Sequence, residues 1–140
     1  MQELTLFLSQ HLLLSGATAI VLILVLLVEV LKLRQKSVNL TPTQATQLIN
    51  HANALVIDIR PSEQYRKGHI IDSECLSLQE LQQGNKKLEK LKSRPLIILC
   101  PTGTESQKLA AQLLKQGYNA HALGGGIRAW TNAQMPLVKD

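Results

Sequence analysis

The feature that most constrains this chain of 140 residues is a long apolar stretch near its start. Residues 12–31 hold 16 apolar side chains among 20, and Glu29 is the only charged residue in the stretch. A helix of about 20 residues is about 30 Å long, which matches the hydrocarbon core of a bilayer. Buried helices of soluble domains rarely carry Leu, Ile and Val on every face over such a length. The stretch therefore predicts a membrane-spanning helix.

A cleaved signal peptide is the alternative interpretation of this stretch. A signal peptide has basic residues before the apolar run and a small-residue cleavage site after it. Residues 1–11 contain no Lys or Arg, and the run ends in Glu29, Val30 and Leu31. We therefore expect the helix to stay attached, with Glu29 paired to Lys32 one turn further on.

The charges that flank the stretch predict its orientation. Lys32, Arg34 and Lys36 follow the apolar run, whereas Glu3 is the only charged residue before it. Because basic residues mark the cytoplasmic side, we expect the part that follows to lie in the cytoplasm. The predicted organisation is a short extracytoplasmic tail (1–11), a transmembrane helix (12–31), a basic juxtamembrane linker (32–37) and a cytoplasmic domain (38–140).

Patterns typical of helices and strands alternate through residues 38–140. Thr41, Pro42 and Gln44 form a helix start, with a Thr cap and a proline in the first helical turn. Thr104 and Gln107 predict a second capping box, before a helix that ends near Gly117. Residues 54–59 and 96–99 are largely apolar runs of strand length, and residues 74–77 and 120–123 are shorter candidate strands. The alternation predicts an α/β fold, a parallel sheet flanked by helices.

Cys100 lies where a sheet of this kind binds its ligands. It ends an apolar strand and precedes a loop that leads into a helix. The loop consists of Pro101, Thr102, Gly103, Thr104, Glu105 and Ser106. Inward backbone N–H groups and a helix N-terminus stabilise an anion there, whether a thiolate, a persulfide or a bound oxyanion. Cys100 is therefore a candidate nucleophile, with an inert buried cysteine as the alternative.

Three motifs of the chain resemble those of rhodanese-like domains. They are Asp58-Ile59-Arg60 with Glu63, Tyr65 and Gly68-His69-Ile70; Cys100 with Gly103; and LGGGIRAW from Leu123 to Trp130. With the apolar stretch included, the chain is similar to single-domain, membrane-anchored rhodanese-like proteins of proteobacterial inner membranes. The resemblance implies a rhodanese-like fold and the transfer of sulfane sulfur through a persulfide on Cys100. It implies a sulfur donor such as thiosulfate or a protein persulfide.

Two residues of the loop depart from the family pattern. Many active members have a basic or another non-acidic polar residue at the position of Glu105, where a negative charge opposes both a thiolate and thiosulfate. An acidic residue in the first turn of a helix is, however, favourable in itself. Pro101 has no N–H group, so one hydrogen-bond donor is lost from the loop. We therefore expect thiosulfate to be a poor substrate unless Lys108, Arg60 or Arg128 reaches the mouth of the site.

Other residues are expected to support the site without taking part in the chemistry. The expected roles are an ion pair at a strand end for Asp58 and Arg60, a hydrogen bond to a loop for His69, and a core position for Trp130. Cys75 is a candidate for resolving a persulfide on Cys100, with an ordinary packed thiol as the favoured alternative in a reducing compartment. The histidines lack the spacing of metal ligands, so we expect no metal and no cofactor.

The basic residues Lys86, Lys87, Lys90, Lys92 and Arg94 form the densest cluster of positive charge. Leu88 and Leu91 are three residues apart, which favours a short helix with a solvated polar face. No aromatic residues interleave there, so we expect no nucleic-acid partner. The expected partners are the lipid bilayer, the sulfur donor and, as an open alternative, an inner-membrane protein.

The sequence leaves two alternatives to a sulfurtransferase. One is a catalytically degenerate rhodanese module that binds a membrane protein partner, which the anchor would hold close by. The other is a phosphatase-like esterase. It is disfavoured because the span from Cys100 to Glu105 is one residue shorter than in the phosphatase relatives and lacks their phosphate-binding arginine.

Overall fold

The computed structural model describes residues 2–84 and 86–140, and for residues 2, 4, 5, 8 and 33–37 the description is confined to the backbone. The chain divides into two units, Met1–Lys36 and Ser37–Asp140, each of which is described by itself.

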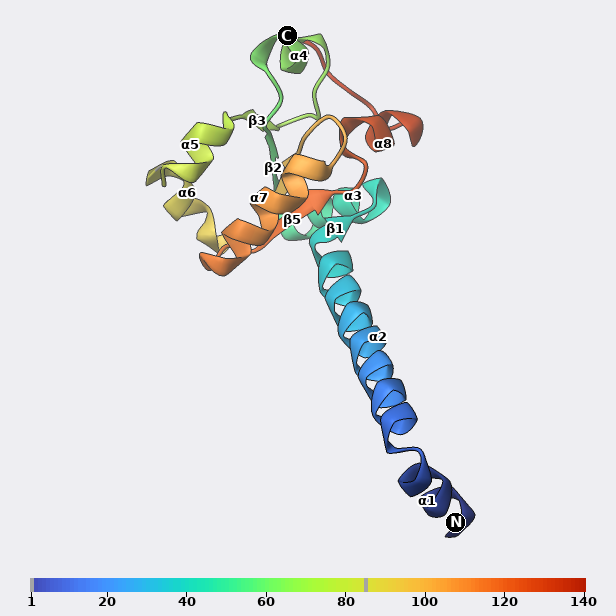
Figure 1. Ribbon diagram of the computed structural model, residues 1–140. Coiled ribbons are helices and arrows are strands. Elements are labelled where there is room, and N and C mark those ends of the chain that lie inside the picture. The colour runs from blue at the N-terminus through green and yellow to red at the C-terminus, as the bar shows by residue number, and fades with distance from the viewer. Residues whose placement is uncertain (1, 85) are drawn as a thin grey trace. The chain divides into compact units, whose positions relative to one another are not determined.

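The first unit is helical. Helix α1 spans Gln2–Gln10, within the expected tail, and α2 spans Leu12–Val38 (Figure 1). The segment Leu12–Lys32 is long and apolar enough to cross a membrane, and none of it is buried against the described part of the chain. A core helix of a soluble protein would be mostly buried, although a signal sequence would share both properties. Glu29 and Lys32 approach to 4.0 Å, as expected.

The expected linker, residues 32–37, is helical because α2 continues to Val38. The side chains of Arg34 and Lys36, on which the orientation argument depends, lie outside the described residues.

The second unit is built on a parallel sheet of five strands in the order β1-β5-β4-β2-β3. The strands are β1 (Asn39–Leu40), β2 (Leu55–Asp58), β3 (Glu74–Cys75), β4 (Leu96–Leu99) and β5 (Ala120–Leu123). The four-residue strands coincide with the apolar runs, because a strand covered on both faces must be apolar on both. The register pairs Asp58 with Leu99 on one side and with Cys75 on the other.

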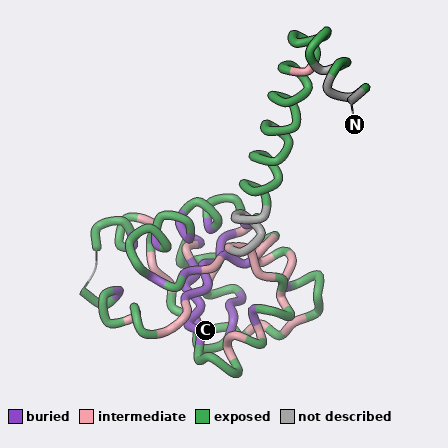
Figure 2. The backbone as a smooth tube through the Cα atoms, turned by 90° about the horizontal axis from the view of Figure 1, so that it is seen from below, coloured by how far each residue is buried: buried purple, intermediate pink, exposed green. Residues whose placement is uncertain are grey.

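Alternate residues of the central strands enter two separate cores. Leu55, Ile57, Leu96 and Ile98 pack with α5 (Leu78–Gln82), α6 (Lys86–Glu89) and α7 (Thr104–Lys115) on one face. Val56, Ile97 and Leu99 pack on the other face with α3 (Pro42–Ala52) and α8 (Gly126–Asn132). Figure 2 shows the buried backbone gathered inside this unit. Helices therefore cover both faces of the sheet, which leaves its edges for loops and sites.

Helix α3 starts with the capping box expected from the sequence. The Gln44 N–H donates to the Thr41 hydroxyl at 3.2 Å, and the Thr41 N–H donates to the Gln44 side-chain oxygen at 3.0 Å. A second capping box starts α5, where the N–H of Ser77 donates to Glu80 Oε2 at 2.7 Å. The Ser-x-x-Glu pattern of this box is visible in the sequence.

The capping box expected at Thr104 was wrong. Gly103 caps α7, with a φ of 93°, and Thr104 is the first helical residue. The N–H of Gln107 donates to the Gly103 carbonyl at 3.2 Å. Glycine reaches this left-handed conformation without steric cost, so the helix starts at Thr104, one residue earlier than expected.

The basic cluster forms short helices, as expected. Lys86–Glu89 is α6, and Lys90–Ser93 is a 3-10 helix, η1. Leu88 is buried and Leu91 packs against the same core, whereas Lys86, Lys90 and Lys92 are exposed. The remaining short helix is α4 (Ser62–Lys67).

The Ser77–Glu80 capping box predicts a loss of stability in acid. Hydrogen bonds from the backbone N–H and then the hydroxyl of Ser77 lower the pKa of Glu80 below its ordinary value. The stabilisation is therefore complete above the pKa of the unfolded chain and is lost as the pH falls through the lower folded-state pKa. Glu80→Gln keeps a capping side chain but cannot titrate. It should make thermal unfolding less sensitive to pH between about pH 6 and about pH 3, whereas an unchanged pH dependence would contradict this assignment.

Candidate active site

Cys100 follows the last residue of β4, between the carboxyl ends of β2 and β5. Its side chain is fully buried. The sheet thus places Cys100 where parallel α/β folds bind ligands, as the sequence predicted. Pro101, Thr102 and Gly103 form the turn after the strand, and Thr104, Glu105 and Ser106 are the first residues of α7.

The loop folds back so that its backbone contacts the sulfur. The N–H of Gly103 donates to Cys100 Sγ at 2.9 Å. The positive φ of Gly103 then turns the chain into α7. Within the described residues, Gly103 is the loop residue whose backbone N–H bonds to Sγ; Thr102, Thr104 and Glu105 are exposed and Pro101 is half-buried. The inward backbone N–H groups expected around the sulfur are therefore present in part.

Ser106 supplies a polar contact that the sequence did not predict. Its Oγ lies 3.2 Å from Cys100 Sγ, and the Ser106 hydroxyl donates to the Gly103 carbonyl at 3.0 Å. Ser106 is fully buried in the first turn of α7. In this arrangement the thiol S–H donates to Ser106 Oγ. Rotation of the hydroxyl would instead let it donate to a thiolate or persulfide, since a hydroxyl is both donor and acceptor.

A glycine-rich turn packs against the backbone of the Cys100 loop. It consists of Gly124 and Gly125, which follow β5, and Gly126, the first residue of α8; the Ile127 N–H donates to the Cys100 carbonyl at 3.0 Å. A Cβ on Gly126 would overlap the carbonyl oxygens of Cys100 and Pro101. A Cβ on Gly103 would come within 2.8 Å of the Gly125 nitrogen. The two loops therefore approach so closely that side chains are excluded at these positions.

Asp58 and Arg60 form the ion pair expected at the end of β2. Arg60 Nη2 lies 2.7 Å from Asp58 Oδ2, and Arg60 Nε lies 3.0 Å from both carboxylate oxygens. Arg60 also donates to the Gly68 carbonyl at 2.8 Å. The pair is almost completely buried. Arg60 is therefore committed to holding the loop after β2.

His69 and Trp130 have structural roles, as expected. His69 Nδ1 lies 3.0 Å from the Tyr65 carbonyl, and its ring stacks on Tyr65 with 4.0 Å between centroids. His69 also exchanges backbone hydrogen bonds with Val138, which ties the C-terminal residues to the domain. Trp130 is buried in the core beside α3, and its indole N–H donates to the Pro136 carbonyl at 3.1 Å.

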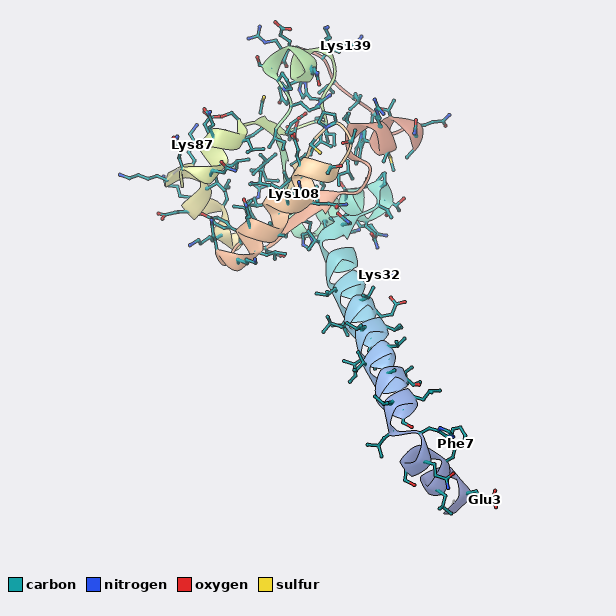
Figure 3. All side chains as sticks on the ribbon, in the orientation of Figure 1. Glu3, Phe7, Lys32, Lys87, Lys108 and Lys139 are labelled. Carbon is teal, nitrogen blue, oxygen red and sulfur yellow. The ribbon has the colours of Figure 1, made fainter. Side chains whose placement is uncertain are left out.

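Glu105, Lys108 and Arg128 are exposed, whereas Arg60, the other charged residue expected near the mouth of the site, is buried in its ion pair. Glu105 and Lys108 line a groove of about 230 Å³ with residues of α5 and α7. Figure 3 labels Lys108 on α7. Arg128 is exposed on α8. Because solvent screens exposed charges, the effect of Glu105 on the sulfur is weaker than the sequence alone suggested.

Cys75 lies at the end of β3, two strands away from Cys100. Its neighbour in register is Asp58, which pairs in turn with Leu99. Strands are about 4.8 Å apart, so the two cysteine Cα atoms are about 10 Å apart, beyond disulfide range. Burial, and next the negative charge of Asp58, raise the pKa of the Cys75 thiol. Both observations favour the packed-thiol interpretation of Cys75.

The close approach of the two loops predicts a sharp contrast between two glycines. Gly126 and Gly117 both have positive φ, but only the Cβ of an alanine at Gly126 would meet other atoms within 4 Å. Gly117→Ala should cost about 1–2 kcal/mol in unfolding free energy, from the left-handed backbone alone. Gly126→Ala should cost about 2–5 kcal/mol and change the rate of Cys100 alkylation. Equal costs in a denaturant titration would show that the loops are not in contact.

Comparisons with known proteins agree with this geometry. The Rhodanese-like domain family matches residues 41–133. The chain is 36% identical over 141 aligned positions to the uncharacterized protein YibN of Escherichia coli (strain K12), covering 99% of both chains. It is 33% identical over 97 residues to the thiosulfate sulfurtransferase GlpE of Pseudoalteromonas translucida, covering 69% of this chain and 90% of that protein.

A solved structure shows the same fold. A rhodanese-related protein from Thermoplasma volcanium superposes with a TM-score of 0.65 and 22% identity, covering 73% of this chain and 98% of that chain. The family match spans most of the second unit, including Cys100, Ser106 and the Gly124–Gly126 turn. The chain therefore belongs to the family of rhodanese-like domain proteins.

Proposed function

We propose that this chain is a membrane-anchored sulfurtransferase that carries sulfane sulfur as a persulfide on Cys100. The observation that carries the proposal is the short hydrogen bond from the Gly103 N–H to Cys100 Sγ, at the carboxyl end of β4. A backbone donor aimed at a sulfur stabilises negative charge there. The relative named as a thiosulfate sulfurtransferase supports the same reaction class.

The proposed reaction has two steps. In the first, the Cys100 thiolate attacks the sulfane sulfur of a donor such as thiosulfate, the S–S bond of the donor breaks, and sulfite leaves with the bonding electrons. In the second, an acceptor thiolate or cyanide attacks the outer sulfur of the persulfide, and the Cys100 thiolate leaves. The protein is unchanged over the cycle, and no external oxidant or reductant is consumed.

The residues around Cys100 have distinct roles in these steps. The Gly103 N–H holds the sulfur in both its thiolate and persulfide forms. The hydroxyl of Ser106 accepts the S–H in the resting thiol and rotates to donate once the proton has left to solvent. Because Pro101 provides no N–H donor and Glu105 adds a negative charge, weakened by solvent, in the first turn of α7, thiosulfate is a poor donor.

A binding module is the second candidate function, and one observation favours it. Cys100 is fully buried, so a substrate reaches Sγ only if the loop opens. In this alternative the domain no longer transfers sulfur and instead recognises an inner-membrane protein beside the anchor. A domain with this function would form no persulfide with any donor.

The sulfurtransferase proposal predicts different results for the two cysteines. Cys100→Ser should abolish thiocyanate formation from thiosulfate or a protein persulfide and cyanide, because a hydroxyl cannot carry sulfane sulfur. Cys75→Ser is the matched control and should keep most of the activity. Mass spectrometry of the donor-treated wild type should show an adduct of about 32 Da on Cys100. Absence of the adduct with every donor would contradict the proposal and favour the binding module.

We also propose that Leu12–Lys32 anchors the chain in a bacterial inner membrane with the domain in the cytoplasm. The length and composition of this helix and the basic residues after it support this placement.

The proposed topology predicts protection from external protease. Protease added to intact spheroplasts should leave the Ser37–Asp140 unit whole, and the same protease should cleave it after lysis. A periplasmic protein degraded in the intact spheroplasts serves as the control. Cleavage of the unit before lysis would place the domain on the other side of the membrane.

A further inference from the structure

The two edges of the sheet differ in what they carry. All five strands are parallel, so they start at one edge, here called the amino edge, and end at the other. The chain enters β1 at Asn39, directly after α2. Cys100 follows the end of β4, at the opposite edge. Four residues of strand span about 13 Å, which separates the cysteine from the amino edge.

Basic residues gather at the amino edge. Lys92 Nζ lies 5.2 Å from the ring centroid of Tyr118, which precedes β5 by two residues. Arg94 donates through Nε to the carbonyl of Asn53 at 2.8 Å, just before β2. These two contacts place η1 and the residues after it at the starts of the strands.

Two more lysines belong to the same edge. Lys115 is in the last turn of α7, which runs back from the Cys100 loop to the start of β5. Lys90 is in η1, and Figure 1 shows η1 near the end of α7. Lys90, Lys92 and Lys115 are exposed, and Arg94 is half-buried. Within residues 86–94, Glu89 is the acidic residue. We name Lys90, Lys92, Arg94 and Lys115 the amino-edge patch.

The opposite edge carries charges of both signs. The elements and loops there hold Arg66, Lys67, Arg128 and Lys139, but also Glu63, Asp72, Glu105 and Asp140. The excess positive charge of Ser37–Asp140 is therefore concentrated toward the amino edge. A uniform basic surface would attract an anionic partner in any orientation, whereas this distribution selects one edge.

We propose that the amino-edge patch is a second membrane contact, which binds the phosphate groups of anionic lipids and turns the Cys100 loop away from the bilayer. The proposal rests on the membrane anchoring proposed above. The occupant follows from the sequence, since the patch belongs to the domain edge entered from an apolar helix of spanning length and a basic flank. Leu114, which precedes Lys115, is 40% exposed and leaves an apolar side chain at the same end of α7, as suits a lipid interface.

This orientation determines which substrates reach the site. With the amino edge on the lipid surface, the Cys100 loop faces the soluble phase. Sulfur donors and acceptors are then soluble molecules or proteins, and a partner embedded in the bilayer contacts the domain at other surfaces.

The reactivity of individual lysines tests the orientation in the full-length chain. The protein is reconstituted in nanodiscs of phosphatidylcholine, with or without phosphatidylglycerol, and treated with an acetylating reagent before mass spectrometry. At low salt, Lys90, Lys92 and Lys115 should react at least about threefold more slowly in the anionic nanodiscs, and about 1 M salt should remove the difference. Lys108 and Lys139 are internal controls and should react equally in both. Equal rates for the patch lysines in both nanodiscs would overturn the proposal.

A second experiment separates the patch from the anchor. Ser37–Asp140 contains the whole sheet and both cores, and the Thermoplasma volcanium structure consists almost entirely of the matching part. This unit should sediment with phosphatidylglycerol vesicles but not with phosphatidylcholine vesicles. Lys90→Gln/Lys92→Gln/Lys115→Gln should weaken binding about a hundredfold, since each basic residue contributes about fivefold. Arg66→Gln/Lys67→Gln/Arg128→Gln makes the same change of charge at the other edge and should bind normally.

The two proposals fail in different ways. Release of the full-length chain from membranes by alkaline carbonate would contradict the anchor, while vesicle binding by Ser37–Asp140 would still support the patch. Equal binding of the two triple variants, both checked for folding by thermal unfolding, would overturn the patch and leave the anchor intact. Protection of the patch lysines by RNA but not by anionic vesicles would also overturn the lipid assignment.

Discussion

The contact between the Cys100 loop and the Gly124–Gly126 turn determines the geometry of the site. The Ile127 N–H holds the Cys100 carbonyl, and Gly126 lies so close to that carbonyl that no side chain fits. Because the Ile127 N–H fixes the Cys100 carbonyl, Cys100 Sγ lies where it accepts a hydrogen bond from the Gly103 N–H. The position of the sulfur therefore depends on two loops that follow adjacent parallel strands, β4 and β5.

The buried ion pair of Asp58 and Arg60 stabilises the neighbouring loop in a comparable way. A buried ion pair contributes little net stability, because desolvation offsets the attraction, but removal of one partner leaves an unpaired buried charge. Arg60 also donates to the Gly68 carbonyl, so the pair connects the end of β2 to the segment that follows α4. Its role is to specify one loop conformation, which explains why neither residue is free to bind a substrate.

The sequence predicted those parts of the structure that depend on local patterns. The apolar runs identified β2, β4 and β5, and the Thr41 capping box located the start of α3. Strand β1 was missed because two residues, Asn39 and Leu40, carry no periodicity. Thr104 fits a capping pattern, but Gly103 caps the helix because its left-handed backbone packs against the Gly124–Gly126 turn, a contact that no local pattern contains.

The sequence predicted the position of the candidate site and an inward backbone N–H in its loop, but not the side-chain contact of Ser106. A cysteine at the end of a buried strand is recognisable from the sequence, because every parallel sheet brings such residues to the same edge. The contact between Ser106 and Cys100 spans a turn and a helix start, so spacing alone does not show whether the hydroxyl faces inward. How many of the backbone N–H groups in the loop point at the sulfur is likewise a property of the folded loop.

The hydrogen bonds around Cys100 relate its burial to its proposed chemistry. In the resting state the S–H donates to Ser106 and the Ser106 hydroxyl donates to Gly103, so every polar hydrogen in this small network is satisfied. A thiolate accepts hydrogen bonds only, and it therefore requires the Ser106 hydroxyl to leave the Gly103 carbonyl. That carbonyl keeps the N–H of Gln107 as a partner, so the rotation leaves no buried acceptor without a donor. The same fold thus accommodates the neutral thiol and the charged sulfur with the movement of one hydroxyl group.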